Sequence, residues 1–249
     1  MSAAIKVAQV TLLFWLMKIC ATTLGETAGD LLSMTLGIGY AASTAILLGV
    51  FAVTLALQLA CNRFVPPIYW LVILSTSTAG TTLSDFMDRT LGLGYATGSA
   101  ILASCLIAVL ATWRFTQGSL SVQNIASRRA ELFYWAAILV SNTLGTALGD
   151  FLADDSGLGF LGSALLIGAA IAVVAACAAL TRIDRVPLFW IAFVLTRPFG
   201  ATFGDLLTKT SDRGGLDLGT VGASAVLGAI LLVGVIHASR RPLEPTSTR

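Results

Sequence analysis

Charged residues are scarce in this chain. Only 11% of its 249 residues are Asp, Glu, Lys or Arg, while 56% are hydrophobic, and soluble domains carry roughly one quarter charged residues. The formal net charge of +2 and the lack of a basic cluster exclude the surface that nucleic-acid binding requires, so we expect no nucleic-acid partner. The composition is typical of a protein embedded in a lipid bilayer, which is the first partner that we expect.

Reactive side chains are also too few for familiar catalytic or metal sites. His237 is the one histidine, so neither a histidine-based metal site nor a Ser-His-Asp triad can be assembled. The four cysteines stand singly, without a CxxC pair, and no GxxxxGK[ST] loop for a nucleotide is present. We therefore expect no cofactor and no catalytic residue. An intramembrane enzyme has nothing that specifies a substrate or a nucleophile.

What the chain does have is a repeat. An element of the form Gly-x-x-x-Gly/Ser-Asp occurs four times, and a tryptophan stands fifteen residues before each of its aspartates. The tryptophans are Trp15, Trp70, Trp135 and Trp190, and the aspartates are Asp30, Asp85, Asp150 and Asp205. The steps between the aspartates are 55, 65 and 55 residues, which indicates an internal duplication of a pair of repeats.

Continuous apolar runs predict eight transmembrane helices, because a bilayer core about 30 Å thick needs roughly 20 apolar residues. The runs cover residues 10–32, 38–60, 68–88, 93–113, 132–153, 158–180, 188–208 and 218–238. A transmembrane β-barrel would instead require alternating segments of about ten residues. We predict an all-α integral membrane protein that forms a single membrane domain over residues 1–249.

The predicted domain consists of four tandem, parallel helical-hairpin repeats with pseudo-two-fold, nearly four-fold, internal symmetry. The repeats cover residues 10–60, 68–113, 132–180 and 188–238, and residues 239–249 form a tail. Glycines that tolerate positive φ, such as Gly37 and Gly39, join the two helices of the first three repeats. The fourth repeat has a longer polar insertion.

Basic residues concentrate in the connections between repeats and in the tail. They are Arg63, Arg114, Arg128, Arg129, Arg182, Arg185, Arg240, Arg241 and Arg249. The positive-inside rule then predicts a multi-pass protein with both termini in the cytoplasm, in which every repeat crosses the membrane in the same direction.

A polar face follows the first helix of repeat one. At 100° per residue, Lys18, Thr22, Glu26 and Asp30 fall on one side of that helix. A carboxylate within a span costs roughly 2.5 to 3.5 kcal/mol, so it usually faces the bundle interior or a water-filled cavity. The predicted cation-binding and coupling residues are Lys18, Glu26, Asp30, Asp85, Asp150, Asp205 and Arg197, with Glu26, Asp30 and Asp150 as metal ligands. The predicted cavity-lining residues are the four tryptophans with Thr22, Ser77 and Asn142.

Each of these features also has a structural interpretation. The aspartates would merely cap helix ends in interfacial water, and Lys18 or Arg197 would form a structural ion pair with a carboxylate. The tryptophans would be interfacial anchors. Glycines four residues apart let helices approach closely, either within one chain or between the chains of a homo-oligomer.

Together, the tryptophan, the Gly-x-x-x-Gly/Ser-Asp element and the GLGY-like turn of the tandem units resemble a family of bacterial integral membrane proteins. The defining unit of that family is known as a repeat of unknown function. The resemblance extends from Trp15 to His237. It implies eight helices in four hairpins and no established activity, in agreement with a bacterial cytoplasmic (inner) membrane location. Repeat four departs from the pattern, because Pro198 replaces the threonine of the other repeats and the GLGY-like turn is missing.

Two classes of function follow from these residues. The first is a small secondary transporter or ion-conducting protein whose cargo is a proton or a small cation such as Mn²⁺, since hard divalent cations prefer oxygen ligands. In that hypothesis Lys18 pairs with Glu26 while the site is empty, and cargo binding breaks the pair. The second is a non-transporting accessory or sensor protein whose buried ionic network is structural.

Overall fold

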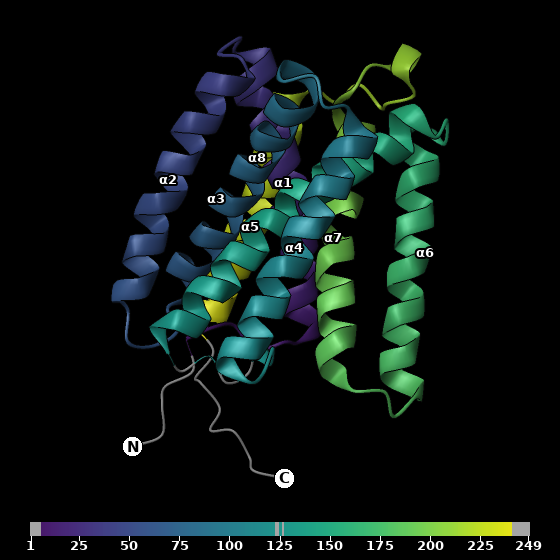
Figure 1. Ribbon diagram of the computed structural model, residues 1–249. Coiled ribbons are helices and arrows are strands. Elements are labelled where there is room, and N and C mark those ends of the chain that lie inside the picture. Colours follow the sequence, from purple (N-terminus) through teal and green to yellow (C-terminus); the bar gives the residue numbers. More distant parts are fainter. Residues whose placement is uncertain (1–5, 123–124, 126, 241–249) are drawn as a thin grey trace.

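The computed structural model describes residues 6–122, 125 and 127–240, and this part of the chain is helical without a strand (Figure 1). Its eight α-helices are α1 (Leu12–Asp30), α2 (Tyr40–Ala60), α3 (Pro66–Asp85), α4 (Tyr95–Gln117), α5 (Arg128–Asp150), α6 (Gly159–Leu180), α7 (Arg185–Thr208) and α8 (Thr220–Arg240). The all-α prediction is confirmed for these residues. The predicted tail residues 241–249, which include Arg241 and Arg249, lie outside the described residues.

Three of the helices, α1, α3 and α5, end at the aspartate of their repeat, and each continues directly into a short π-helical segment. These segments are η1 (Leu31–Thr35), η2 (Phe86–Thr90) and η4 (Phe151–Asp155). Each is followed by a glycine turn, and in the first turn Gly37 and Gly39 have φ of 68° and 82°, as their predicted role in reversing the chain requires. In repeat four, α7 instead leads into a loop that contains the short 3₁₀-helix η5 (Ser211–Arg213).

The four odd-numbered helices form an inner ring. α1 packs against α3, α3 against α5, α5 against α7, and α7 closes the ring against α1. Glycines permit these contacts: a Cβ on Gly25 would overlap the Ser77 side chain of α3, and a Cβ on Gly200 would meet Thr22 of α1. The glycine elements therefore bring helices together within the chain.

The even-numbered helices form an outer layer that covers the neighbouring repeat. α2 packs on α3, α4 on α5, α6 on α7 and α8 on α1. The two helices of each predicted hairpin are consecutive in the chain, but they do not pack mainly on one another, because each outer helix packs on the inner helix of the next repeat. This exchange interlocks the four repeats, and it buries every inner helix between two ring neighbours and one outer helix.

The outer surface is apolar. Large side chains on the four outer helices, for example Val53, Ile107, Leu165 and Val233, are more than 60% exposed. Among the described residues, six helices are long and apolar enough to cross a membrane, namely α2, α4, α5, α6, α7 and α8. α1 and α3 do not reach that level because they carry many of the polar residues of the ring interior. These features are compatible with a multi-pass membrane protein, and the prediction of eight spans is supported for six helices.

Candidate functional site

Arg197 is the centre of a buried polar cluster on the axis of the inner ring. From α7, its Nη2 donates to Glu26 Oε2 of α1 at 2.9 Å. The same nitrogen donates to the hydroxyls of Thr81 on α3 and Thr146 on α5. A side chain of one ring helix can meet the other three only near the axis, so the Arg197 guanidinium lies there, 0% exposed.

Closer to the start of α1 than Glu26, Lys18 reaches across the ring from α1 to the opposite helix α5. Its Nζ donates to Asn142 Oδ1 at 3.4 Å and lies 4.2 Å from the centre of the Phe193 ring. The expected pairing of Lys18 with Glu26 is not present, because Glu26 is held by Arg197. The register of the repeats explains this, since it places Arg197 one helical turn closer to Glu26 than Lys18.

The position of Arg197 in its repeat corresponds to Thr22, Ser77 and Asn142 in the others. Gly25 contacts Ser77, Gly80 contacts Asn142, Gly145 contacts Arg197 and Gly200 contacts Thr22, so the four residues occupy one layer of the ring. Thr22 donates its hydroxyl to backbone carbonyls, including that of Thr196 at 3.1 Å. Asn142 donates to Thr76 at 3.0 Å, and the Ser77 hydroxyl has no partner among the described residues.

The four aspartates lie further along the ring, and two cations bridge them in pairs. Arg89 contacts Asp85 of its own repeat at 2.9 Å and Asp150 of the next repeat at 3.3 Å. Lys209 is placed in the same way: it contacts Asp205 of its own repeat at 3.1 Å and also the first aspartate, Asp30. Each cation follows its aspartate by four residues in an even-numbered repeat. The pairing therefore has the two-fold symmetry of the duplication.

The helix-capping interpretation is wrong for Asp30, Asp85 and Asp150. Their helices do not end at the aspartate but continue into η1, η2 and η4, and the side chains make no capping hydrogen bond. All four aspartates are 4% exposed or less. Their carboxylates face basic groups inside the ring rather than interfacial water.

Three buried carboxylates converge to form what we call the carboxylate site, which consists of Glu26, Asp30 and Asp205. One oxygen of each lies within 4.8 Å of the others. Two of the three predicted metal ligands are thus brought together, but Asp150 lies with Arg89 and its place is taken by Asp205. The reason is the order of the ring, in which α7 is a neighbour of α1 whereas α5 lies opposite.

Two residues of the site were missed from the sequence, Arg89 and Lys209. A signal for them was present, since a basic residue stands four positions after the aspartate in repeats two and four but not in repeats one and three. On a helix this spacing places the two side chains side by side. Their second partners, Asp150 and Asp30, belong to other helices and required the structure.

The tryptophans form an aromatic layer near the beginnings of the inner helices. Trp70, Trp135 and Trp190 are 5% exposed or less, so the interpretation of these three as interfacial anchors is wrong. They pack with Tyr69 and Tyr134, whose hydroxyls are 2.6 Å apart. Trp15 is half-buried, 5.2 Å from the neighbouring phenylalanine ring. The predicted cavity-lining tryptophans thus pack against other rings.

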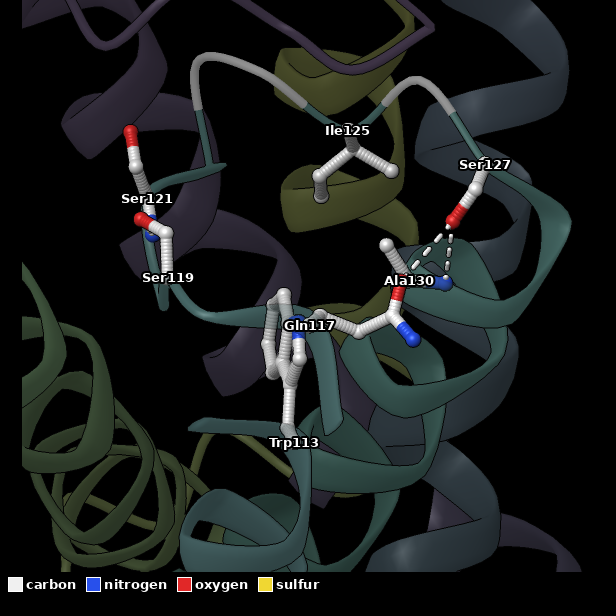
Figure 2. Close-up of a pocket in the computed structure, with 7 residues that line it drawn as sticks. All are labelled: Trp113, Gln117, Ser119, Ser121, Ile125, Ser127 and Ala130. Atoms are coloured by element: carbon white, nitrogen blue, oxygen red, sulfur yellow. Dashed lines mark hydrogen bonds between the residues drawn. The ribbon is translucent and has the colours of Figure 1, made fainter. Parts of the chain in front are cut away.

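A separate pocket of about 180 Å³ lies between the end of α4 and the start of α5 (Figure 2). Its lining residues are Trp113, Gln117, Ser119, Ser121, Ile125, Ser127 and Ala130. Within it, the hydroxyl of Ser127 accepts a hydrogen bond from the backbone N–H of Ala130 at 3.0 Å, which caps α5. None of the predicted site residues lines this pocket, and its lining contains no charged side chain.

A family model described as Repeat of Unknown Function (DUF347) matches the chain four times in tandem. The matches cover residues 13–64, 68–119, 133–184 and 188–242, which together are most of the chain. They confirm the resemblance to a family built from four repeats of unknown function. Neither a curated protein nor a solved structure matches the chain.

Proposed function

This chain belongs to the Repeat of Unknown Function (DUF347) family, and from that premise we propose that it is a small secondary transporter for a cation. The observation that carries the proposal is the convergence of three buried carboxylates, Glu26, Asp30 and Asp205, inside the inner ring. Like charges this close repel one another strongly in a low-dielectric interior unless a proton or a cation lies among them. The carboxylate site therefore favours occupation by a positive charge.

In the proposed cycle, Lys209 is the counter-ion of the empty site. Its ammonium contacts both Asp30 and Asp205, and its side chain is 15% exposed. Lys209 directly follows α7 and begins the loop that is peculiar to repeat four, so it can withdraw toward the surface. Arg197, which is 0% exposed, cannot. Cargo and Lys209 compete for the same oxygens, which gives the two exchangeable states that a transporter needs. This role replaces the one first expected of Lys18.

Charge balance favours a divalent cargo. When Lys209 withdraws, the three carboxylates and Arg197 together carry two net negative charges, which one divalent cation neutralises. Carboxylate and hydroxyl oxygens suit Mg²⁺ or Mn²⁺. The Thr81 hydroxyl, 3.3 Å from Glu26 Oε2, offers one further oxygen. Protons are the coupling ions of this proposal, because the three carboxylates, Arg197 and the returned Lys209 together carry one net negative charge, which one proton balances.

The proposal places the protein in the bacterial inner membrane with both termini in the cytoplasm. The connections between repeats carry Arg63 and Arg182, and Arg114 lies in the last turn of α4, just before such a connection. These connections lie at the end of the bundle where α1 begins and α8 ends (Figure 1). The positive-inside rule assigns this end to the cytoplasm, so the aspartates lie toward the outer side. A single chain suffices for the site, because the ring closes within it.

A second candidate function rests on a different observation. Glu26 and the four aspartates of the repeats each have a basic partner: Arg197 for Glu26, Lys209 for Asp30 and Asp205, and Arg89 for Asp85 and Asp150. A non-transporting accessory or sensor protein would use such a network only to hold its helices together. Hydrophobic replacement of a buried ion pair is often neutral or stabilising. In that case the double variant Arg197→Met with Glu26→Met keeps its function.

Cation-dependent thermal unfolding of the detergent-purified protein tests the proposal. We expect Mn²⁺ or Mg²⁺ to raise the unfolding temperature saturably, and Glu26→Gln to abolish the rise. Lys209→Gln removes the competitor, so it should lower the concentration of cation needed for half the effect. The matched control is Asp85→Asn, which removes an equivalent buried aspartate that pairs with Arg89 instead of Lys209 and should preserve the response. A folded wild type that responds to no cation at any concentration favours the structural network.

A further inference from the structure

Two basic side chains lie near the ring axis, before the layer of the aspartates. They are Lys18 from α1 and Arg197 from α7, which we call the axial cation pair. Both side chains are 0% exposed. Arg197 is paired with Glu26 at 2.9 Å. Within the part of the chain that the structure describes, Lys18 has no carboxylate partner and contacts only Asn142 Oδ1 and the Phe193 ring. A buried ammonium without a counter-ion is costly, and an anion beside it would offset that cost.

Unsatisfied donors lie around the same stretch of the axis. Of the three guanidinium nitrogens of Arg197, Nε and Nη1 have no hydrogen-bond partner among the described residues. The Ser77 hydroxyl has none either, although the neighbouring Thr76 and Thr78 donate to backbone carbonyls of their own helix. Ser77 occupies the same layer of the ring as Arg197. A buried donor that lacks an acceptor costs about 1 to 3 kcal/mol, and more when it is charged.

These groups share one deficiency, because each of them has at least one donor hydrogen for which the described residues offer no acceptor. The carboxylates of the ring do not remedy it, since Glu26 already accepts from Arg197 Nη2 and Thr81, and the aspartates lie one turn further along the helices. Asn142 cannot help either: its amide nitrogen donates to Thr76, and its oxygen is the one weak acceptor of Lys18 at 3.4 Å.

We propose that a small inorganic anion of halide size binds between Lys18 and Arg197. It accepts hydrogen bonds from the Lys18 ammonium, from Arg197 Nε and Nη1 and from the Ser77 hydroxyl, and it supplies the counter-charge that Lys18 lacks. Only a small anion suits this position, because α1 and α3 approach closely at Gly25, and α5 and α7 at Gly145. The site adjoins the carboxylate site, because Arg197 also pairs with Glu26, but it uses other atoms, namely Nε and Nη1 of Arg197 rather than Nη2.

Halide-dependent thermal unfolding of the full-length, detergent-purified protein tests this site. Sodium chloride or bromide replaces sodium gluconate at constant ionic strength and constant Na⁺, so the carboxylate site sees no change of cation. We expect a saturable rise in unfolding temperature with chloride and with bromide and none with sulfate, which is too large. Lys18→Met should abolish the rise. Lys6→Met is the matched control, because Lys6 already has a carboxylate partner in Glu131, and it should respond like the wild type.

Ser77→Ala keeps the proposal testable if Lys18→Met does not fold. It removes one neutral donor and no charge, and it should raise the chloride concentration needed for half the effect severalfold. A wild type that unfolds at one temperature in all four salts would overturn the proposal, and so would a Lys18→Met protein with an unchanged chloride response. Because no divalent cation is added, failure here leaves the proposed cation transport untouched, and failure of the cation response leaves this site untouched.

Discussion

Replacing Gly200 with alanine tests whether the inner ring closes between its last helix, α7, and its first, α1. An added Cβ would stand 2.6 Å from Thr22 Oγ1, 2.7 Å from Thr22 Cβ and 2.8 Å from the Thr22 carbonyl carbon. A change of rotamer can move the hydroxyl away, but it cannot move the backbone carbon. The two helices must therefore separate.

The size of the effect follows from three terms. Overpacking of a close-packed interior costs about 1 to 3 kcal/mol. Separation of the helices also weakens the hydrogen bond from Thr22 to the Thr196 carbonyl, 3.1 Å long, which is worth about 1 kcal/mol. Alanine gains about 1 kcal/mol over glycine in helix propensity. The sum is a loss of about 1 to 3 kcal/mol, which lowers the unfolding temperature of a domain of this size by about 2 to 12 °C.

The assay is thermal unfolding in one detergent, followed by tryptophan fluorescence, with Gly49→Ala as the control. Gly49 faces outward on α2, and a Cβ there meets no atom of the described residues within 4 Å. Gly49→Ala should therefore unfold at the wild-type temperature or above it. If Gly200→Ala unfolds at the same temperature as Gly49→Ala, α7 and α1 do not pack as described and the ring is not closed.

Three further predictions concern the other buried polar groups. Arg89→Met leaves Asp85 and Asp150 buried without their basic partner, so it should lower the free energy of unfolding by about 3 to 5 kcal/mol. Adding Asp85→Asn should recover part of this loss. An Arg89→Met protein as stable as the wild type in thermal unfolding would contradict the bridge. Tyr69→Phe leaves the Tyr134 hydroxyl buried without its partner and should lower the free energy of unfolding by about 1 to 3 kcal/mol. The double variant with Tyr134→Phe should be nearly as stable as the wild type. A double variant as unstable as Tyr69→Phe would argue against the hydroxyl pair. Burial lowers the pKa of Lys209, but the two neighbouring aspartates raise it by a larger amount. The pKa of Lys209 therefore lies above the ordinary value. The stability that the ion pairs of Lys209 contribute is thus complete below about pH 10 and is lost only as pH rises through the folded-state pKa. The difference in unfolding temperature between the wild type and Lys209→Met should therefore stay constant from about pH 7 to about pH 9. A difference that disappears in this range would contradict the pairing.

Features that depend on neighbouring residues could be predicted from the sequence. The helices followed from the length of the apolar runs, and the turns followed from glycines such as Gly92 and Gly94, which adopt φ of 71° and 72°. The polar face of α1 was also predicted, since Lys18, Glu26 and Asp30 are all buried in the ring. Helical periodicity alone determines which residues share such a face.

Features that depend on the order of helices in space could not be predicted in this way. Asp150 was expected beside Glu26 because of the duplication, but the closed ring places Asp205 there instead. Four equivalent repeats are compatible with several ring orders, and the sequence does not distinguish them. The partner of Glu26 is likewise decided by the register between α7 and α1, which brings Arg197 to it rather than Lys18. The buried tryptophans depend on the same packing.

Uptake of Mn²⁺ into proteoliposomes would show whether Glu26, Asp30 and Asp205 bind a transported cation. A fluorophore sealed inside the vesicles and quenched by Mn²⁺ reports entry, with the wild type, Glu26→Gln and the matched control Asp85→Asn reconstituted to equal density. We expect saturable entry for the wild type and Asp85→Asn, and entry at the rate of protein-free vesicles for Glu26→Gln. Equal entry with the wild type and Glu26→Gln, or no entry with a folded wild type, would contradict the proposed transport.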